Sequence, residues 1–148
     1  MGPETLSNWG MDWAWGLPLI VLTVVFHAFG LGFINKRIAF MLGGSGWLRN
    51  QSTVAIFVMG GTALWATLLH GFECALWAGA FRFLAALPDN RTAMLYSLSA
   101  MTSYGHENFE LARDWQLMGA LEALNGWILF GLTAAFLFTI MQKAWSST

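Results

Sequence analysis

Three long apolar runs decide what this chain can fold into. Residues 16–34, 53–87 and 117–142 are poor in charge, and a helix of about 20 such residues crosses the hydrocarbon core of a bilayer. Hydrophobic residues make up 57% of the 148 positions and charged residues only 10%, whereas charged residues are about a quarter of a soluble domain. The sequence therefore predicts an all-α membrane protein of one domain, residues 1–148, with three transmembrane helices.

The second run is longer than one crossing requires. As a continuous helix, residues 53–87 would measure about 50 Å, against a hydrocarbon core of about 30 Å. We expect this helix either to tilt and project beyond the bilayer or to break, with Gly71 and Gly79 as candidate break points and Pro88 as its end. Residues 2–15, before the first run, are rich in tryptophan and are expected to lie in the membrane interface.

Charge and cysteine content exclude several classes of function. The net charge is −1 and the seven Lys and Arg residues are scattered, which argues against nucleic acid or an anionic lipid surface as a partner. The single cysteine, Cys74, cannot form an intrachain disulfide. The sequence has no nucleotide-binding motif and no nucleophile–base set. We expect no enzyme activity and no cofactor other than a bound monovalent or divalent cation.

A short semi-polar run separates the second and third apolar runs. Asp89 offers a side-chain oxygen as the N-cap of a helix from about Arg91 to Met101, and small and hydroxylated residues follow. A segment too short to cross a bilayer is tolerated at membrane depth only where other protein surrounds it, because lipid cannot hydrogen-bond irregular backbone. Residues 90–108 are therefore predicted to form a pore helix and a filter-like loop. A re-entrant turn of a non-channel membrane protein would have the same local features.

The segment Thr102-Ser-Tyr-Gly-His-Glu-Asn108 resembles the filter sequence T-T-V/L-G-Y-G-D of potassium channels. Farther on, Gly119-Ala-Leu-Glu-Ala-Leu-Asn-Gly126 and the stretch from Leu129 to Phe138 are similar to the inner helix of small bacterial proteins in the two-pore-domain-type ion channel family. The likeness covers about residues 53–142. It implies a potassium-channel-like fold with one pore loop per chain, four chains around one axis, and ion transport down an electrochemical gradient. The resemblance places these residues along the ion pathway: Thr102, Ser103, Tyr104, Gly105, His106 and Glu107.

The filter departs from the family pattern at three positions. His106, Glu107 and Asn108 stand where the family has Tyr, Gly and Asp. Because the Cβ of Glu107 disfavours the backbone conformation that glycine allows, the outer ion sites are expected to be lost and potassium selectivity to be weak. Around an axis, Glu107 with His106 would form a ring that concentrates cations or holds a divalent metal ion. Alternatively, Glu107 pairs with Arg113 or Arg91 and leaves the axis uncharged.

Polar residues inside the first two apolar runs are further candidate sites. His27 is the only ionisable residue of the run 16–34. It is interpreted as a hydrogen-bonded packing residue, with a ligand or proton-relay role as the alternative. His70 and Glu73 stand at i and i+3 on one helical face. They are either a pair of metal ligands or a hydrogen-bonded pair that faces another helix.

The start of the third apolar run carries small and polar residues. Gly119, Ala123 and Gly126 form a stripe along which another helix, from the same chain or from a neighbour, can approach closely. Glu122 needs a partner or a proton at that depth. The candidates are the filter-loop backbone, Asn125 and an arginine before the run. Three residues are expected to support the filter from this helix: Glu122, Asn125 and Gly126.

Basic residues set the predicted orientation. Lys36, Arg37, Arg49 and Lys143 fall on one side, with no acidic residue in those loops. By the positive-inside rule this side is cytoplasmic. We therefore expect a multi-pass protein of the cell (inner) membrane with its N-terminus outside and its C-terminus in the cytoplasm.

The sequence as a whole favours a cation channel or channel-like membrane protein that is a homo-oligomer, as a tetramer, in the lipid bilayer. The competing hypothesis is a non-conducting membrane scaffold or accessory subunit that keeps the channel fold, because a fold does not carry its function with it. A third hypothesis is a metal-ion transporter that uses His70, Glu73, His106 and Glu107.

Overall fold

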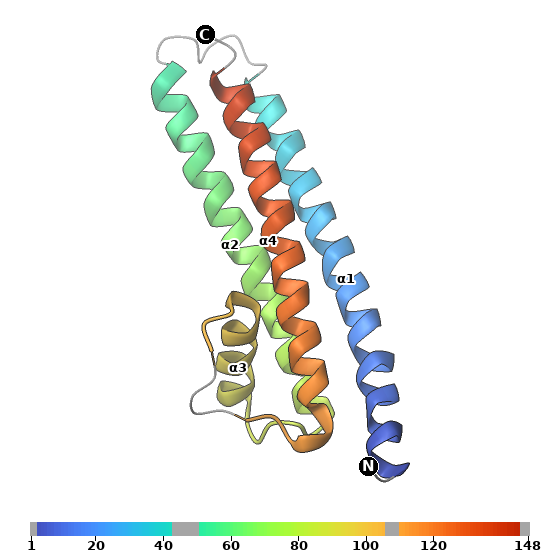
Figure 1. Cartoon of the computed structure of the whole chain (residues 1–148). Coiled ribbons are helices and arrows are strands. Elements are labelled where there is room, and N and C mark those ends of the chain that lie inside the picture. Colours follow the sequence, from blue (N-terminus) through green and yellow to red (C-terminus); the bar gives the residue numbers. More distant parts are fainter. Residues whose placement is uncertain (1–2, 43–50, 106–109, 146–148) are drawn as a thin grey trace.

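The computed structural model describes residues 3–42, 51–105 and 110–145, and the regular structure within these ranges is entirely helical (Figure 1). Three of the helices are long and apolar enough to cross a membrane. This confirms the all-α class and is consistent with a multi-pass membrane protein. The elements in chain order are α1 (Pro3–Leu42), α2 (Gln51–Phe83), α3 (Asn90–Thr102), the 3₁₀ turn η1 (Arg113–Trp115) and α4 (Gln116–Trp145).

The long helices α1, α2 and α4 form one bundle, and the short α3 lies along the lower halves of α2 and α4 (Figure 1). The N-terminal and C-terminal ends of the chain lie at opposite ends of the bundle. α3 begins at the end where α2 finishes and α4 starts, and it stops partway along the bundle. Helix α3 therefore lies beside α2 and α4 for part of their length, and α4 starts at the end of the bundle where α2 finishes.

Helix α1 is longer than the predicted first crossing. It includes residues 3–15, which were predicted as an interfacial lead, and it continues to Leu42. A continuous helix satisfies the backbone hydrogen bonds of these residues wherever they lie relative to lipid. Pro18 sits inside the helix and not in its first turn. The helix continues past Arg37, and the guanidinium of this residue lies over the ring of Phe33, 5.1 Å from the ring centre.

Helix α2 runs unbroken through Gly71 and Gly79, so the predicted break does not occur. A glycine inside a helix lowers its stability by about 1 kcal/mol relative to alanine without interrupting its hydrogen bonds. Neither glycine has another part of the chain within 4 Å of the place where a Cβ would stand. Of the two predicted alternatives, the structure has the long continuous helix.

The end of α2 is set by its backbone before Pro88 is reached. The helix finishes at Phe83. Ala85 has a positive φ of 52°, and the N–H of Ala86 donates to the carbonyl of Phe81 at 2.9 Å. This is the hydrogen-bond pattern of a Schellman turn, which satisfies the last carbonyls of a helix.

Helix α3 is the helix that the Asp89 cap predicts. Asp89 Oδ1 accepts a hydrogen bond from the backbone N–H of Thr92 at 2.9 Å, and Oδ2 accepts one from the Thr92 hydroxyl at 2.7 Å. At the other end, Ser103 has a φ of 56°, and the N–H of Tyr104 donates to the carbonyl of Ser99 at 3.0 Å. Both ends of α3 are therefore closed by local hydrogen bonds.

The cap gives a testable prediction about acid stability. Asp89→Ala is expected to lower the thermal unfolding midpoint, and Asp89→Asn, which keeps an acceptor, to lower it less. The hydrogen bonds from Thr92 hold the pKa of Asp89 below its ordinary value of 3.8. The contribution of the ionised cap is therefore complete above that value and is lost as the pH falls through the lowered pKa. The difference in unfolding midpoint between the wild type and Asp89→Ala should therefore shrink on acidification. If it stays the same, the ionised side chain of Asp89 does not stabilise the helix end.

The densest apolar core lies where α2, α3 and α4 meet. Trp77 and Phe81 of α2 and Met118 and Leu129 of α4 have no exposed surface. The ring of Tyr96 from α3 meets the ring of Phe81 edge-on, with centres 5.4 Å apart, an arrangement that adds to the stabilisation from burial. The short helix α3 is thus part of the core and not an appendage.

Candidate functional site

Buried polar side chains follow the inner face of the bundle. Each lowers stability unless it finds a hydrogen-bond partner, and ionisable groups in apolar helices commonly mark functional sites. Most of them fall into two groups, and the turn after α3 is a third feature. Among the described residues, the buried polar side chains are Asp12, Thr23, His27, Thr62, Glu73, Ser97, Glu122, Asn125 and Thr133.

The first group joins three helices and is called the histidine cluster: His27 of α1, His70 and Glu73 of α2, and Thr133 of α4. His27 Nδ1 lies 2.8 Å from Glu73 Oε1, and His27 Nε2 lies 2.9 Å from Thr133 Oγ1. His70 completes a circle. Its Nε2 is 3.1 Å from Thr133 Oγ1 and its Nδ1 is 3.4 Å from Glu73 Oε2. The side chains of His27 and Glu73 are 0% exposed, and that of His70 is 16% exposed.

Three of the four links in this circle are hydrogen bonds, and their donors and acceptors can be assigned in sequence. His27 Nδ1–H donates to Glu73, so His27 Nε2 accepts the hydroxyl hydrogen of Thr133. Thr133 Oγ1 in turn accepts from the Nε2–H of His70. His70 Nδ1 is then a lone pair that faces a carboxylate oxygen of Glu73. Within the described residues, neither of these two atoms has a hydrogen-bond partner.

The second group ties α4 to its neighbours closer to the start of that helix. The carboxyl group of Glu122 contacts the hydroxyl of Ser97 on α3. The same hydroxyl lies 2.8 Å from the backbone carbonyl of Cys74 on α2. Toward α1, the amide of Asn125 donates to the hydroxyl of Thr23 at 2.8 Å. Glu122 and Asn125, one turn apart on α4, thus contact α3 and α1, and Ser97 links α3 to α2.

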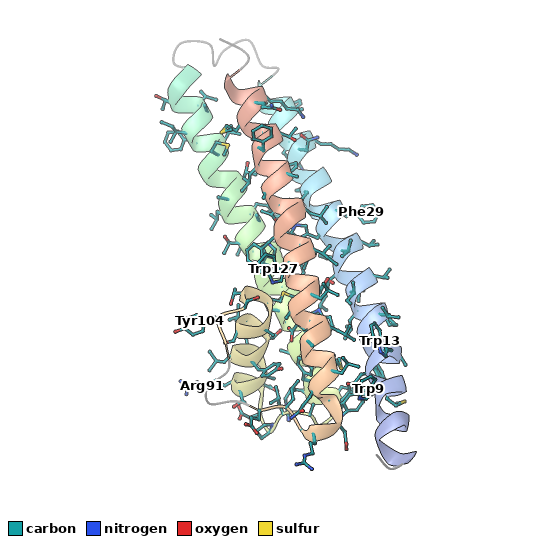
Figure 2. The ribbon with its side chains drawn as sticks, viewed as in Figure 1. Trp9, Trp13, Phe29, Arg91, Tyr104 and Trp127 are labelled. Atoms are coloured by element: carbon teal, nitrogen blue, oxygen red, sulfur yellow. The ribbon has the colours of Figure 1, made fainter. Side chains whose placement is uncertain are left out.

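The turn after α3 is exposed in the single chain. Residues 102–105 all lie at the surface, and Tyr104 is 88% exposed. Figure 2 shows Tyr104 pointing away from the bundle. The indole N–H of Trp127 on α4 donates to the hydroxyl of Ser103 at 3.1 Å. This contact fixes the turn against α4.

The position of the turn along the bundle follows from a close helix contact. A Cβ at Gly126 would overlap the backbone of Met101, so the last turn of α3 lies directly on the backbone of α4. Gly126 is near the middle of Arg113–Lys143, the stretch of α4 that is apolar and long enough to cross a membrane. The turn therefore lies about halfway along that stretch.

The predicted pathway residues are only partly placed. Residues 102–105 form the exposed turn just described. His106, Glu107 and Asn108 lie outside the described residues, and so does any pairing of Glu107 with an arginine. The predicted ring of Glu107 and His106 therefore stays a prediction.

Two interpretations of α4 change. Glu122 contacts Ser97, which was not among its predicted partners, because the buried face of α3 packs on α4. The stripe that includes Gly119 and Gly126 is approached by α3 of the same chain. Of the two alternatives for that stripe, the structure has packing within the chain.

The joining of His27 to His70 and Glu73 was missed from the sequence. His27 was interpreted as a packing residue, with a ligand or relay role as the alternative, and His70 with Glu73 as a pair of metal ligands or a hydrogen-bonded pair that faces another helix, without His27 as its partner. One sequence feature could have suggested the contact, namely the position of each histidine along its helix. His27 and His70 both lie near the middle of their apolar stretches, Trp9–Phe40 and Thr53–Phe83. Residues at equal depth in neighbouring antiparallel helices can meet, although depth alone does not say which faces are turned toward each other.

No protein-family model, no curated protein and no solved structure matches this chain. The class of molecule is therefore defined by its own features. It is an all-helical chain with three helices of membrane-spanning length, a short helix that stops beside the middle of the bundle, and ionisable side chains buried between the helices.

Proposed function

We propose that this chain is the pore-forming subunit of a cation channel and that four copies surround the axis with the residues that follow α3. The observation that carries the proposal is the exposed turn at residues 102–105, halfway along the apolar stretch of α4. Irregular backbone at the depth of the hydrocarbon core needs cover from protein or contact with a water-filled space. Within the described parts of one chain, nothing covers this turn. Several chains around a water-filled axis would supply both the protein cover and the contact with water.

The direction of α3 supports the passage of cations and not of anions. Its capped N-terminus lies at the end of the bundle and its carboxyl end lies at the turn (Figure 1). The carboxyl end of a helix carries a partial negative charge, which stabilises a nearby cation. Gly105 has a φ of 102°, a conformation that glycine adopts without strain and that other residues resist.

Apolar surface around the turn supports assembly from several chains. Leu95 and Leu98 on α3 are 40% and 39% exposed, and Trp127 beside the turn is 70% exposed. Trp127 and Tyr104 both project from the same side of the molecule in Figure 2. Neighbouring copies that cover this side would bury apolar surface and enclose the turn in one step.

The proposed orientation keeps the end that carries Lys36, Arg37 and Lys143 in the cytoplasm of a cell (inner) membrane. The N-terminus is then outside, and α3 enters the bilayer from the outer surface. This is the arrangement that the resemblance to potassium-channel-like pores implies.

Recording from purified protein in a planar bilayer tests the proposal. Cation currents are expected, and a reversal potential near zero under bi-ionic potassium and sodium is expected because Glu107 stands where the resembling family has glycine. Native mass spectrometry is expected to show a tetramer. Gly105→Ala is expected to reduce the conductance, since a Cβ at this φ costs about 1–3 kcal/mol. Gly131→Ala is the matched control, because its Cβ would have open space.

Three results separate the proposal from its competitors. A folded tetramer that passes no current favours a non-conducting scaffold or accessory subunit with the same fold. A stable monomer in mild detergent removes the pore altogether. Flux that requires a transition metal favours the metal-ion transporter.

A further inference from the structure

The histidine cluster carries an inference that does not depend on the pore. We propose that it is a binding site for one divalent transition-metal ion of the Zn²⁺ type, with His27, His70 and Glu73 as the protein ligands. One ligand atom from each of these three residues can be chosen so that all three lie within 4.8 Å of one another. Two imidazoles and one carboxylate are a ligand set that Zn²⁺ uses in proteins.

The contact between His70 Nδ1 and Glu73 Oε2 is the place in the cluster that a cation can bridge, either a proton on His70 or a metal ion. His70 Nδ1 and Glu73 Oε2 face each other at 3.4 Å, and neither has a hydrogen-bond partner within the described part of the chain. Glu73 has no exposed surface, and a buried carboxylate oxygen without a partner is costly. In a tetrahedral site with bonds of about 2.0–2.2 Å, neighbouring ligand atoms are about 3.3–3.6 Å apart. The observed separation fits that range.

Thr133 is positioned to orient both imidazoles. Its Oγ1 lies 2.9 Å from Nε2 of His27 and 3.1 Å from Nε2 of His70. A hydroxyl oxygen accepts two hydrogen bonds, so both Nε2 atoms can carry hydrogen and both Nδ1 lone pairs then point toward Glu73. Binding requires that the proton of His27 moves from Nδ1 to Nε2, that the hydroxyl hydrogen of Thr133 turns away from His27, and that His27 Nδ1 and Glu73 Oε1 separate from their present 2.8 Å. Metal-bound histidines commonly donate their second N–H to such an acceptor.

The ligand types decide which metal fits. Ca²⁺ and Mg²⁺ prefer oxygen ligands, whereas imidazole suits Zn²⁺, Co²⁺, Ni²⁺ and Cu²⁺. The nearby thiol of Cys74 is engaged with the Met101 sulfur at 3.5 Å, so the fourth position is left for water. The ring of His70 stacks on Phe130 with centres 4.6 Å apart, which fixes the plane of the imidazole. A bound ion would link α1 to α2 directly.

The test uses the full-length protein in detergent, stripped with a chelator, with Co²⁺ alone as the probe. Tetrahedral Co²⁺ absorbs visible light much more strongly than the aqueous ion, so binding is read directly. We expect one Co²⁺ per chain, displacement by Zn²⁺, and a rise of the thermal unfolding midpoint with metal concentration. None of these readouts uses ion conduction, so a failed metal site leaves the pore proposal standing.

Substitutions assign the ligands. Thr133→Val is expected to weaken Co²⁺ binding by about 10–100-fold, the usual effect of losing a group that orients a ligand, and Glu73→Gln is expected to weaken it further. The matched controls are Thr62→Val and Glu122→Gln. Thr62 is buried on α2 with its hydroxyl on its own helix, and Glu122 is a buried carboxyl group outside the cluster. Both controls are expected to bind Co²⁺ like the wild type.

A second variant, which is expected to add an absorption band, tests the site even if Glu73→Gln does not fold. His70→Cys places a thiolate in the site and is expected to add a sulfur-to-cobalt charge-transfer band. The proposal is overturned if the folded wild type binds no tetrahedral Co²⁺. In that case a proton, and not a metal ion, bridges His70 Nδ1 and Glu73 Oε2. Undiminished binding by Glu73→Gln, or His70→Cys without the new band, overturns it as well.

Discussion

Replacing Gly126 with valine is expected to force α3 away from α4 and to lower the free energy of unfolding by about 1–3 kcal/mol or more, the cost of an overpacked core. A Cβ at this position would lie 2.8 Å from the Cα of Met101 and 2.9 Å from its carbonyl carbon, and closer still to the carbonyl oxygen. These atoms belong to the backbone. They cannot rotate out of the way as a side chain can, so the whole end of α3 has to shift.

Gly131→Val is the matched control for this substitution. It lies on the same helix, and no atom stands within 4 Å of its missing Cβ. Both changes replace glycine with the same β-branched residue, so the intrinsic helix preference cancels in the comparison. Unfolding in detergent measures the difference in stability, and amide hydrogen exchange over residues 90–102 shows whether α3 has come loose.

The outcome also bears on the proposed pore. Because the exposed turn follows directly from the end of α3, a displaced α3 is expected to abolish conduction, whereas Gly131→Val is expected to retain it. If Gly126→Val unfolds like Gly131→Val and α3 keeps its protection from exchange, then α3 is not docked on α4 at this glycine.

Features of the fold that depend on local sequence could be predicted. The three apolar runs identify three helices of transmembrane length, because length and composition alone decide that property. α3 was placed correctly from Asp89, whose side chain needs only the N–H groups of the next turn as partners. The ends of helices were harder. α2 ends in a turn with a positive φ at Ala85, and alanine gives no sequence signal for that conformation.

Features that depend on which helix faces meet could not be predicted. The runs that contain His27, Glu73 and Glu122 are apolar nearly all round, so their pattern does not say which face is buried. Glu122 was therefore given the wrong partners, and His27 was not joined to Glu73. The role of each glycine is hard to predict for the same reason, because it depends on which part of the chain packs beside it. Gly71 leaves α2 continuous with open space beside it, whereas Gly126 has a backbone against it.

Helix α4 emerges as the element that holds the others in place. Glu122 and Gly126 face α3, Asn125 faces α1, and Thr133 contacts the histidines of both α1 and α2. The histidine cluster and the turn after α3 are thus attached to the same helix.

The protonation of Glu122 can be inferred by counting hydrogens. The hydroxyl of Ser97 contacts both Glu122 Oε1 and the carbonyl of Cys74, yet it has only one hydrogen to donate. The carbonyl can only accept, and an ionised carboxylate can only accept as well, so one of the two contacts would lack a hydrogen. A protonated carboxyl group supplies the second hydrogen, because the Ser97 hydroxyl then donates to the carbonyl and accepts from Glu122. Glu122 is 0% exposed and its Oε2 has no hydrogen-bond partner within the described residues. A neutral carboxylic acid satisfies this arrangement, whereas an ionised one would be buried without a counter-charge.

Glu122→Gln is therefore expected to change the free energy of unfolding by less than about 1 kcal/mol, because the amide N–H replaces the acid O–H as donor to Ser97. Ser97→Ala is expected to cost about 1–3 kcal/mol, since it leaves the acid hydrogen of Glu122 without its partner in a buried place. Infrared spectroscopy is expected to show the carbonyl stretch of a protonated carboxyl group at neutral pH in the wild type and its loss in Glu122→Gln. If that band is missing from the wild type, or if Glu122→Gln is as destabilising as Ser97→Ala, then Glu122 is ionised and the hydrogen of Ser97 belongs to its carboxylate.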